Sequence, residues 1–88
     1  LMSTQAPAPI QPFNEDSIEK IAYKSVESIP TQEPNDKNRL GYHVWRWLST
    51  KEGTLEQAIL ESNSRLQISN SEAFNIVREG LKKQGVSL

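Results

Sequence analysis

The residue types with the most chemical potential gather in residues 40–48 (LGYHVWRWL), which hold the only histidine, both tryptophans and one of the two tyrosines. Acid–base catalysis by His43 would need a second group to orient its imidazole ring, and the sequence points to none. The chain has no cysteine, no glycine-rich phosphate loop and no GxSxG motif. We therefore expect no enzyme activity, and with it no catalytic residue, metal site, cofactor or small-molecule substrate.

In a helix, this tryptophan-rich stretch has two apolar sides, because residues three or four apart lie on the same side. The first side comprises Leu40, Val44, Trp47 and Leu48. The second side comprises Tyr42, Trp45 and Ser49. One side can face the core of the chain itself. The other side, led by Trp45, needs a separate cover, which is the N-terminal segment, a second subunit or a ligand.

The composition predicts one small soluble domain, since 35% of the 88 residues are hydrophobic and 24% are charged. No apolar run approaches the roughly 20 residues of a membrane helix, and no signal peptide is visible. We therefore expect a cytoplasmic protein without membrane contact. The net charge of −1 does not indicate a general nucleic-acid binder, but the charge is uneven. Residues 1–36 carry six acids and two bases, whereas residues 37–88 carry eight bases and five acids, so the second part is mildly basic.

Hydrophobic periodicity predicts an all-α fold, a small four-helix domain at residues 14–88 that follows a disordered proline-rich tail at residues 1–13. The helices are expected at about residues 15–29, 37–51, 54–65 and 70–84. Asn14 is the expected cap of the first helix, and Phe13 and Ile18 have the spacing of a hydrophobic staple. The apolar stripe of this helix comprises Ile18, Ile21, Ala22, Val26 and Ile29. That stripe packs either on the tryptophan helix or on a second subunit.

The bounds of the other three helices are predicted from the residue types expected at helix ends. Pro34 is expected to keep the preceding connector non-helical, so that Asn35, Asp36 or Asn38 caps the second helix. Capping-box spacing occurs at Thr54–Gln57 and at Ser69–Glu72. Glycines suited to left-handed C-terminal caps occur at Gly53 and Gly85. Leu60 lies off the predicted inner face of the third helix.

The segment TLEQAI, followed by ISNSEAFNIVREGLKKQGV, reads as a short helix, a polar cap and a longer helix. Leu81 stands four residues before Gly85, which an apolar residue follows. Residues 54–88 thereby resemble the second and third helices of the winged helix-turn-helix superfamily. The resemblance implies a trihelical helix-turn-helix-like core with the tryptophan helix as its first member. The interval from Ala58 to Ile68 is several residues longer than the usual turn, and no two-stranded wing follows.

The resemblance also implies that the last helix enters the major groove of DNA. The nucleic-acid-binding residues expected on this basis are Ser71, Asn75, Arg78, Lys82, Lys83 and Arg65. Asn75 and Arg78 have the chemistry to read adenine and guanine edges, and the lysines can contact phosphates. Glu72 and Glu79 share that surface and repel phosphates. The alternative is therefore a solvated helix face with paired charges.

Two hypotheses follow from the sequence. The first is a helix-turn-helix domain of the transcription-regulator kind that binds double-stranded DNA, as a dimer because one module with few bases binds weakly. The second is a non-catalytic protein-interaction or dimerisation module, with a second copy or another protein as its partner. Its expected interaction residues are Trp45, Tyr42, Ile18, Ile21 and Val26.

Overall fold

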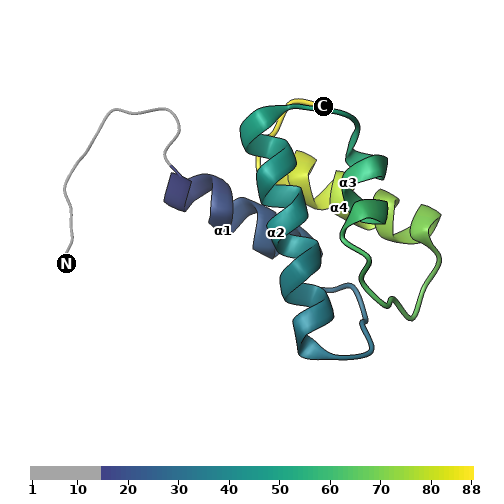
Figure 1. Ribbon diagram of the computed structural model, residues 1–88. Coiled ribbons are helices and arrows are strands. Elements are labelled where there is room, and N and C mark those ends of the chain that lie inside the picture. The colour runs from purple at the N-terminus through teal and green to yellow at the C-terminus, as the bar shows by residue number, and fades with distance from the viewer. Residues whose placement is uncertain (1–14) are drawn as a thin grey trace.

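A computed structural model describes residues 15–88 of the chain, and side chains from Ser17 onward, as four helices (Figure 1). They are α1 (Glu15–Val26), α2 (Pro34–Thr50), α3 (Leu55–Glu61) and α4 (Asn70–Lys83). Within residues 15–88 the only strand-like pairing is a single bridge between Thr31 and Leu66. The predicted all-α class is therefore confirmed. The predictions of a proline-rich tail, an Asn14 cap and a staple from Phe13 concern residues that lie outside the described range.

Each helix packs against two others, in the order α1, α2, α3, α4 and back to α1 (Figure 1). The backbone of α4 therefore approaches α1 and α3, and α2 approaches α1 and α3. The resemblance implied that α2, α3 and α4 form a trihelical core of their own. In the structure α1 is an integral fourth member, so a separate trihelical unit remains a prediction.

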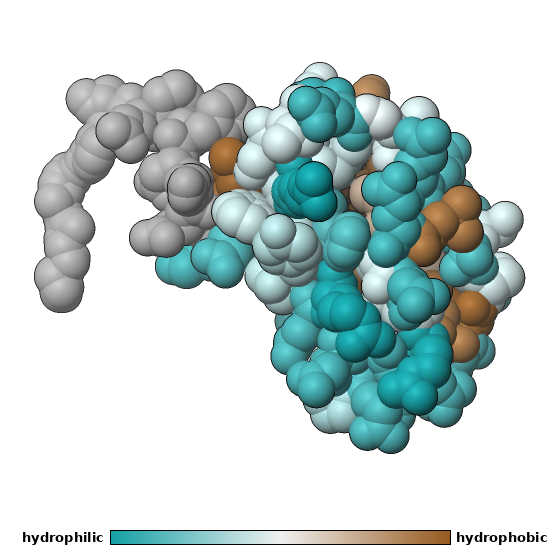
Figure 2. All heavy atoms as spheres, viewed as in Figure 1, coloured by the Kyte–Doolittle hydropathy of each residue, from teal (hydrophilic) through white to brown (hydrophobic). Residues whose placement is uncertain are grey.

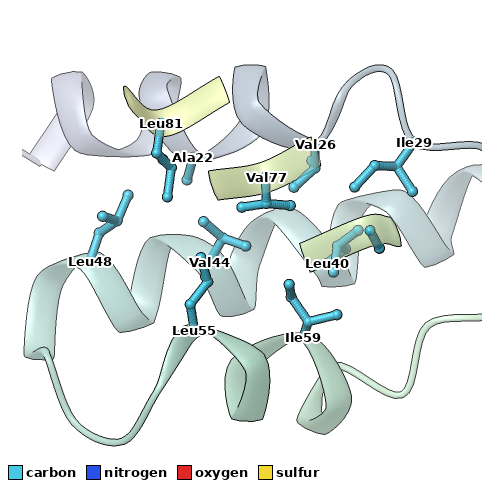
Figure 3. Packing of buried hydrophobic residues seen from close by; sticks show 11 residues of the cluster. Ala22, Val26, Ile29, Leu40, Val44, Leu48, Leu55, Ile59, Val77 and Leu81 are labelled. Atoms are coloured by element: carbon cyan, nitrogen blue, oxygen red, sulfur yellow. The ribbon is translucent and has the colours of Figure 1, made fainter. Parts of the chain in front are cut away.

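The core is a single cluster of aliphatic side chains contributed by all four helices (Figure 3). Figure 3 shows Val44 of α2 in the middle of the cluster, with Val77 of α4 and Leu55 of α3 on opposite sides of it. The fully buried hydrophobic residues are Ala22, Val26, Ile29, Leu40, Val44, Ala73, Val77 and Leu81. Their burial agrees with the predicted apolar stripe of α1 and with the first predicted apolar side of α2, and the stripe on α1 packs within the chain.

Several predicted helix boundaries are wrong. The first helix ends at Val26, although Ile29 beyond its end is still buried. The second helix begins at Pro34, which occupies a first-turn position where a missing N–H costs nothing, so Pro34 starts the helix and does not exclude it. The third helix ends at Glu61, because the chain reverses at Asn63 with a left-handed φ of 52°. Asn63 adopts this left-handed conformation, which asparagine tolerates better than most residues other than glycine.

Three predicted caps are confirmed, but the N-cap of α2 is Glu33 and not Asn35, Asp36 or Asn38. The Thr54 hydroxyl accepts from the Gln57 N–H at 3.1 Å, and the Gln57 side chain accepts from the Thr54 N–H at 2.9 Å. The Ser69 hydroxyl accepts from the Glu72 N–H at 3.1 Å. Gly85 has a φ of 91° and closes α4 in a Schellman motif, in which the Val86 N–H donates to the Leu81 carbonyl oxygen. The left-handed cap of α2 is Lys51, two residues before the predicted Gly53.

None of the four helices within residues 15–88 combines the length and apolar character needed to cross a membrane.

Two glycines inside helices mark close crossings with α1. A Cβ atom on the buried Gly41 of α2 would overlap the aromatic ring of Tyr23. A Cβ atom on Gly80 of α4 would lie 3.2 Å from the Ser25 Cα atom. The absence of a side chain at both positions lets α1 pack closely on α2 and α4.

Gly41→Ala is expected to lower the free energy of unfolding by up to about 2 kcal/mol, because moving a half-buried tyrosine ring costs about 1–3 kcal/mol. This cost exceeds the roughly 1 kcal/mol that alanine gains over glycine in a helix. Gly80→Ala is the matched control, since it has the same gain and requires a shift of only a few tenths of an ångström. Urea unfolding compares the two variants. Equal stability of both would contradict the tight packing of Tyr23 on Gly41.

Candidate interaction surfaces

The outward face of α4 carries four of the six predicted nucleic-acid-binding residues. Ala73, Val77 and Leu81 bury the opposite face of this helix. The four residues on the outward stripe are Ser71, Asn75, Arg78 and Lys82, of which Arg78 is half-buried and the others are exposed. Their helical spacing places them in one row about 16 Å long. The structure therefore brings these four side chains together.

The other two predicted residues lie apart from this row. Lys83 borders a groove between α4 and α1. Arg65 lies in the connector before α4, where its guanidinium is bound to the Asp36 carboxylate at 3.2 Å. Arg65 is therefore already committed to a structural contact.

Acidic side chains offset the cations on α4. The Glu79 carboxylate lies 3.4 Å from Arg78 and 3.8 Å from Lys82. These exposed pairs add little stability, but they lower the positive charge that the stripe presents. Glu72, in the first turn of α4, is also exposed. The paired-charge alternative raised by the sequence therefore describes this face in the structure.

A buried carboxylate fixes the connector that leads into α4. Asp36 is completely buried in the first turn of α2. Its carboxylate accepts main-chain N–H groups of Glu33 at 3.0 Å and Arg65 at 3.2 Å, and it also binds the guanidinium groups of Arg65 and Arg39. The Asp36 carbonyl oxygen accepts from the Ser64 hydroxyl at 2.7 Å. One residue thus holds α2 and the α3–α4 connector together.

Main-chain hydrogen bonds extend this contact between the two connectors. The Gln32 N–H donates to the Arg65 carbonyl oxygen, and the Gln67 N–H donates to the Pro30 carbonyl oxygen, each at 2.9 Å. The long interval between α3 and α4 is therefore bound to the α1–α2 connector through residues 65–67.

Among the side chains that the structure describes, from Ser17 onward, two have shifted pKa values. Burial alone would raise the pKa of the Asp36 carboxyl. The hydrogen bonds from Arg65 and Glu33, with the charge of Arg65, outweigh that effect and hold the pKa below its ordinary value of 3.8. Burial, with the negative charge of Glu19, raises the pKa of the Tyr23 phenol. Asp36 is therefore a carboxylate at neutral pH, and Tyr23 is uncharged.

A groove of about 360 Å³ lies between the end of α3 and the beginning of α4. Its lining comprises Glu56, Ile59, Leu60, Asn70, Ser71, Phe74 and Asn75. Leu60 is 58% exposed, although it is one of the larger aliphatic side chains. Figure 2 shows hydrophobic surface gathered on the side of the molecule where α3 and α4 lie. The groove combines an apolar wall with amide and hydroxyl groups, and its lining includes no lysine or arginine.

The second predicted interaction surface is only partly available. Tyr42 is 44% exposed, and its ring contacts that of Trp45 with centroids 5.5 Å apart. Trp45, Ile18 and Ile21 are half-buried against the core, whereas Val26 lies inside it and adds nothing to a free surface. The Trp45 Nε1 atom is buried without a hydrogen-bond partner in the described structure. This surface is therefore smaller than the sequence suggested.

His43 lines a polar pocket of about 240 Å³ between α2 and α3. Arg46 and Glu61 also line this pocket, and the Trp47 indole N–H donates to the Gly53 carbonyl oxygen at 3.1 Å. No hydrogen bond from His43 to a carboxylate occurs in the described structure. Within residues 15–88, no cluster of three or more histidine, cysteine or acidic residues is placed to hold a metal ion.

No family model, curated protein or solved structure matches this chain. Functional inference therefore rests on the chemistry of these surfaces.

Sequence reasoning missed two residues that shape them. Asp36 was expected only as one of three possible caps, because nothing in the sequence indicates its contact with Arg65, 29 positions away. Leu60 was placed off the inner face of α3, and that position is the signal that could have identified an exposed apolar anchor.

Proposed function

We propose that this domain is a non-catalytic protein-interaction module whose partner docks in the α3–α4 groove. The observation that carries the proposal is Leu60, an exposed leucine beside the half-buried Phe74 in a concave surface that also offers Asn70, Ser71 and Asn75. Apolar concave surfaces with a few polar groups are typical of binding sites. An apolar side chain of a protein partner can fill this hollow, because the contact removes the exposed surface of Leu60 from water.

Electrostatics favours a protein over DNA at this groove. DNA binding depends on lysine and arginine contacts to phosphates. The first cation of α4 is Arg78, in its second half, and Arg78 shares Glu79 with Lys82. Glu56 is the one charged residue in the groove lining. A polyanion entering the groove would therefore meet a carboxylate and no compensating cation.

The same chemistry describes the occupant. Leu60 and Phe74 offer apolar contact to an aliphatic or aromatic anchor, and the Glu56 carboxylate favours a basic residue next to that anchor. The amides of Asn70 and Asn75 can bind main-chain groups of a peptide. We therefore propose a peptide segment with one apolar anchor and one neighbouring lysine or arginine.

Panning a phage-displayed peptide library against the domain is expected to enrich sequences with an apolar anchor and an adjacent basic residue. Leu60→Ala should weaken binding of the selected peptide at least about tenfold, because an anchor contact in a small site contributes much of its affinity. Leu88→Ala is the matched control, since Leu88 is 53% exposed and does not line this groove. Calorimetry measures both affinities. Equal binding by wild type and Leu60→Ala, or no enrichment at all, would refute the proposed site.

DNA binding remains the second candidate, because Ser71, Asn75, Arg78 and Lys82 share one outward stripe of α4. An amide NMR titration of the labelled domain with mixed-sequence duplex at low salt separates the two candidates. Shifts confined to this stripe and fading as salt rises would favour DNA over the peptide. An unchanged spectrum would remove this candidate.

A further inference from the structure

A second groove, of about 500 Å³, lies between α1 and α4 and shares Asn75 with the α3–α4 groove. Ile76 contributes apolar surface to it, and Gly80 lies where the two helices cross. The charged residues of its lining are Lys24 and Glu27 from α1 and Glu79 and Lys83 from α4. All four are exposed, and the groove carries no net charge.

These charges are separated along the groove. Gly80 lies against Ser25, and the Gln84 side-chain amide donates to the Ile21 carbonyl oxygen at 3.0 Å, so α1 and α4 run antiparallel. Lys24 and Lys83 therefore lie on the side of the crossing toward Gln84. Glu27 and Glu79 lie on its other side. The groove consequently has a positive end and a negative end, about one helical turn apart.

We propose that this α1–α4 groove is the interface for a second copy of the chain, arranged about a two-fold axis. In such an interface the same patch meets itself in reverse. The positive end of one copy then faces the negative end of the other, and the axis passes near the crossing of Gly80 and Ser25. A groove with both charge signs at opposite ends is complementary to its own rotated copy, whereas a uniformly charged partner would be repelled at one end.

The other charged residues near the groove do not prevent these contacts between the two copies. Arg78 and Lys82 approach Glu79 at 3.4 and 3.8 Å, in exposed pairs that exchange readily with solvent or a partner. Lys37 donates to the Glu27 carbonyl oxygen at 2.8 Å and does not contribute to the groove lining. Glu79 and Glu27 can therefore receive lysines from a second copy.

Charge reversal tests the arrangement in sedimentation velocity runs from about 10 µM to about 1 mM protein. Wild type should self-associate, and more weakly as salt rises. Each double variant, Lys24→Glu/Lys83→Glu and Glu27→Lys/Glu79→Lys, should self-associate at least about tenfold more weakly, because like charges meet. An equimolar mixture of the two should restore association as a heterodimer. Their circular dichroism should match wild type, since all four positions are exposed.

A second pair of variants separates local contacts from net charge. Arg46→Glu/Lys51→Glu and Glu52→Lys/Glu61→Lys change the net charge equally but lie around the α2–α3 pocket or its adjoining loop. These should self-associate like wild type. A monomeric wild type, unaffected groove variants, or a mixture that stays monomeric would each overturn the proposal. Leu60→Ala should leave association unchanged, so loss of peptide binding and loss of the dimer are read separately.

Discussion

Asp36→Asn is expected to lower the Tm of the domain by on the order of 10 °C. The substitution conserves shape but removes the charge that two guanidinium groups and two main-chain N–H groups share. An asparagine amide would also direct N–H donors at groups that are themselves donors. Differential scanning calorimetry measures the change. Glu52→Gln is the matched control, because it removes an exposed acid that lies outside both proposed interfaces and should shift the Tm by no more than about 2 °C.

The pH dependence provides a second readout of Asp36. A carboxyl whose pKa is lower in the folded chain than in the unfolded chain stabilises the fold at pH values above the unfolded pKa. That contribution is lost as the pH falls below about 3.8, through the folded value. The stability difference between wild type and Asp36→Asn should therefore be constant near neutrality and narrow in acid. A difference that is independent of pH would show that Asp36 acts through packing alone.

The contacts of Asp36 also bear on the proposed peptide groove. Asp36 holds the segment between α3 and α4, and those two helices form the walls of the proposed peptide groove. Asp36→Asn should thus weaken peptide binding even where most molecules remain folded, because the groove loses its fixed geometry. Glu52→Gln should leave peptide binding unchanged.

The parts of the fold that sequence predicted well are those fixed by local chemistry. The stripe from Ala22 to Ile29, the Thr54 capping box and the Schellman motif at Gly85 each depend on residues within one or two helical turns. Pro34 was misread because proline is unfavourable within a helix but favourable at its first turn, and the sequence did not distinguish the two positions.

The parts that sequence could not predict depend on contacts between distant segments. The Asp36–Arg65 pair and the bridge from Thr31 to Leu66 arise only when the two connectors meet. The candidate sites show the same division. Helical spacing placed Ser71, Asn75, Arg78 and Lys82 on one stripe, but only the tertiary fold shows that Arg65 is occupied and that Val26 is buried.

Leu81→Ala is expected to lower the free energy of unfolding by about 2–5 kcal/mol, because it opens a cavity in a core with little capacity to collapse. Leu81 is fully buried, and Figure 3 shows it near Ala22 of α1 and Leu48 of α2. A domain of this size has a total stability of roughly 5–10 kcal/mol, so a substantial fraction is lost. Urea unfolding measures the change, and an effect below about 1 kcal/mol would contradict the packing of α4.

Leu60→Ala is the matched comparison, since the same atoms are removed from an exposed leucine. It should change stability by less than about 0.5 kcal/mol, because the lost side chain is largely in water. Leu81→Ala should reduce peptide binding only in proportion to the unfolded fraction, and binding should recover when the temperature is lowered. Leu60→Ala should weaken binding at least about tenfold at every temperature while the fold persists. The same substitution is thus expected to lower mainly the stability at Leu81 and mainly the peptide affinity at Leu60. This difference would show that Leu81 maintains the fold and that Leu60 contacts the partner.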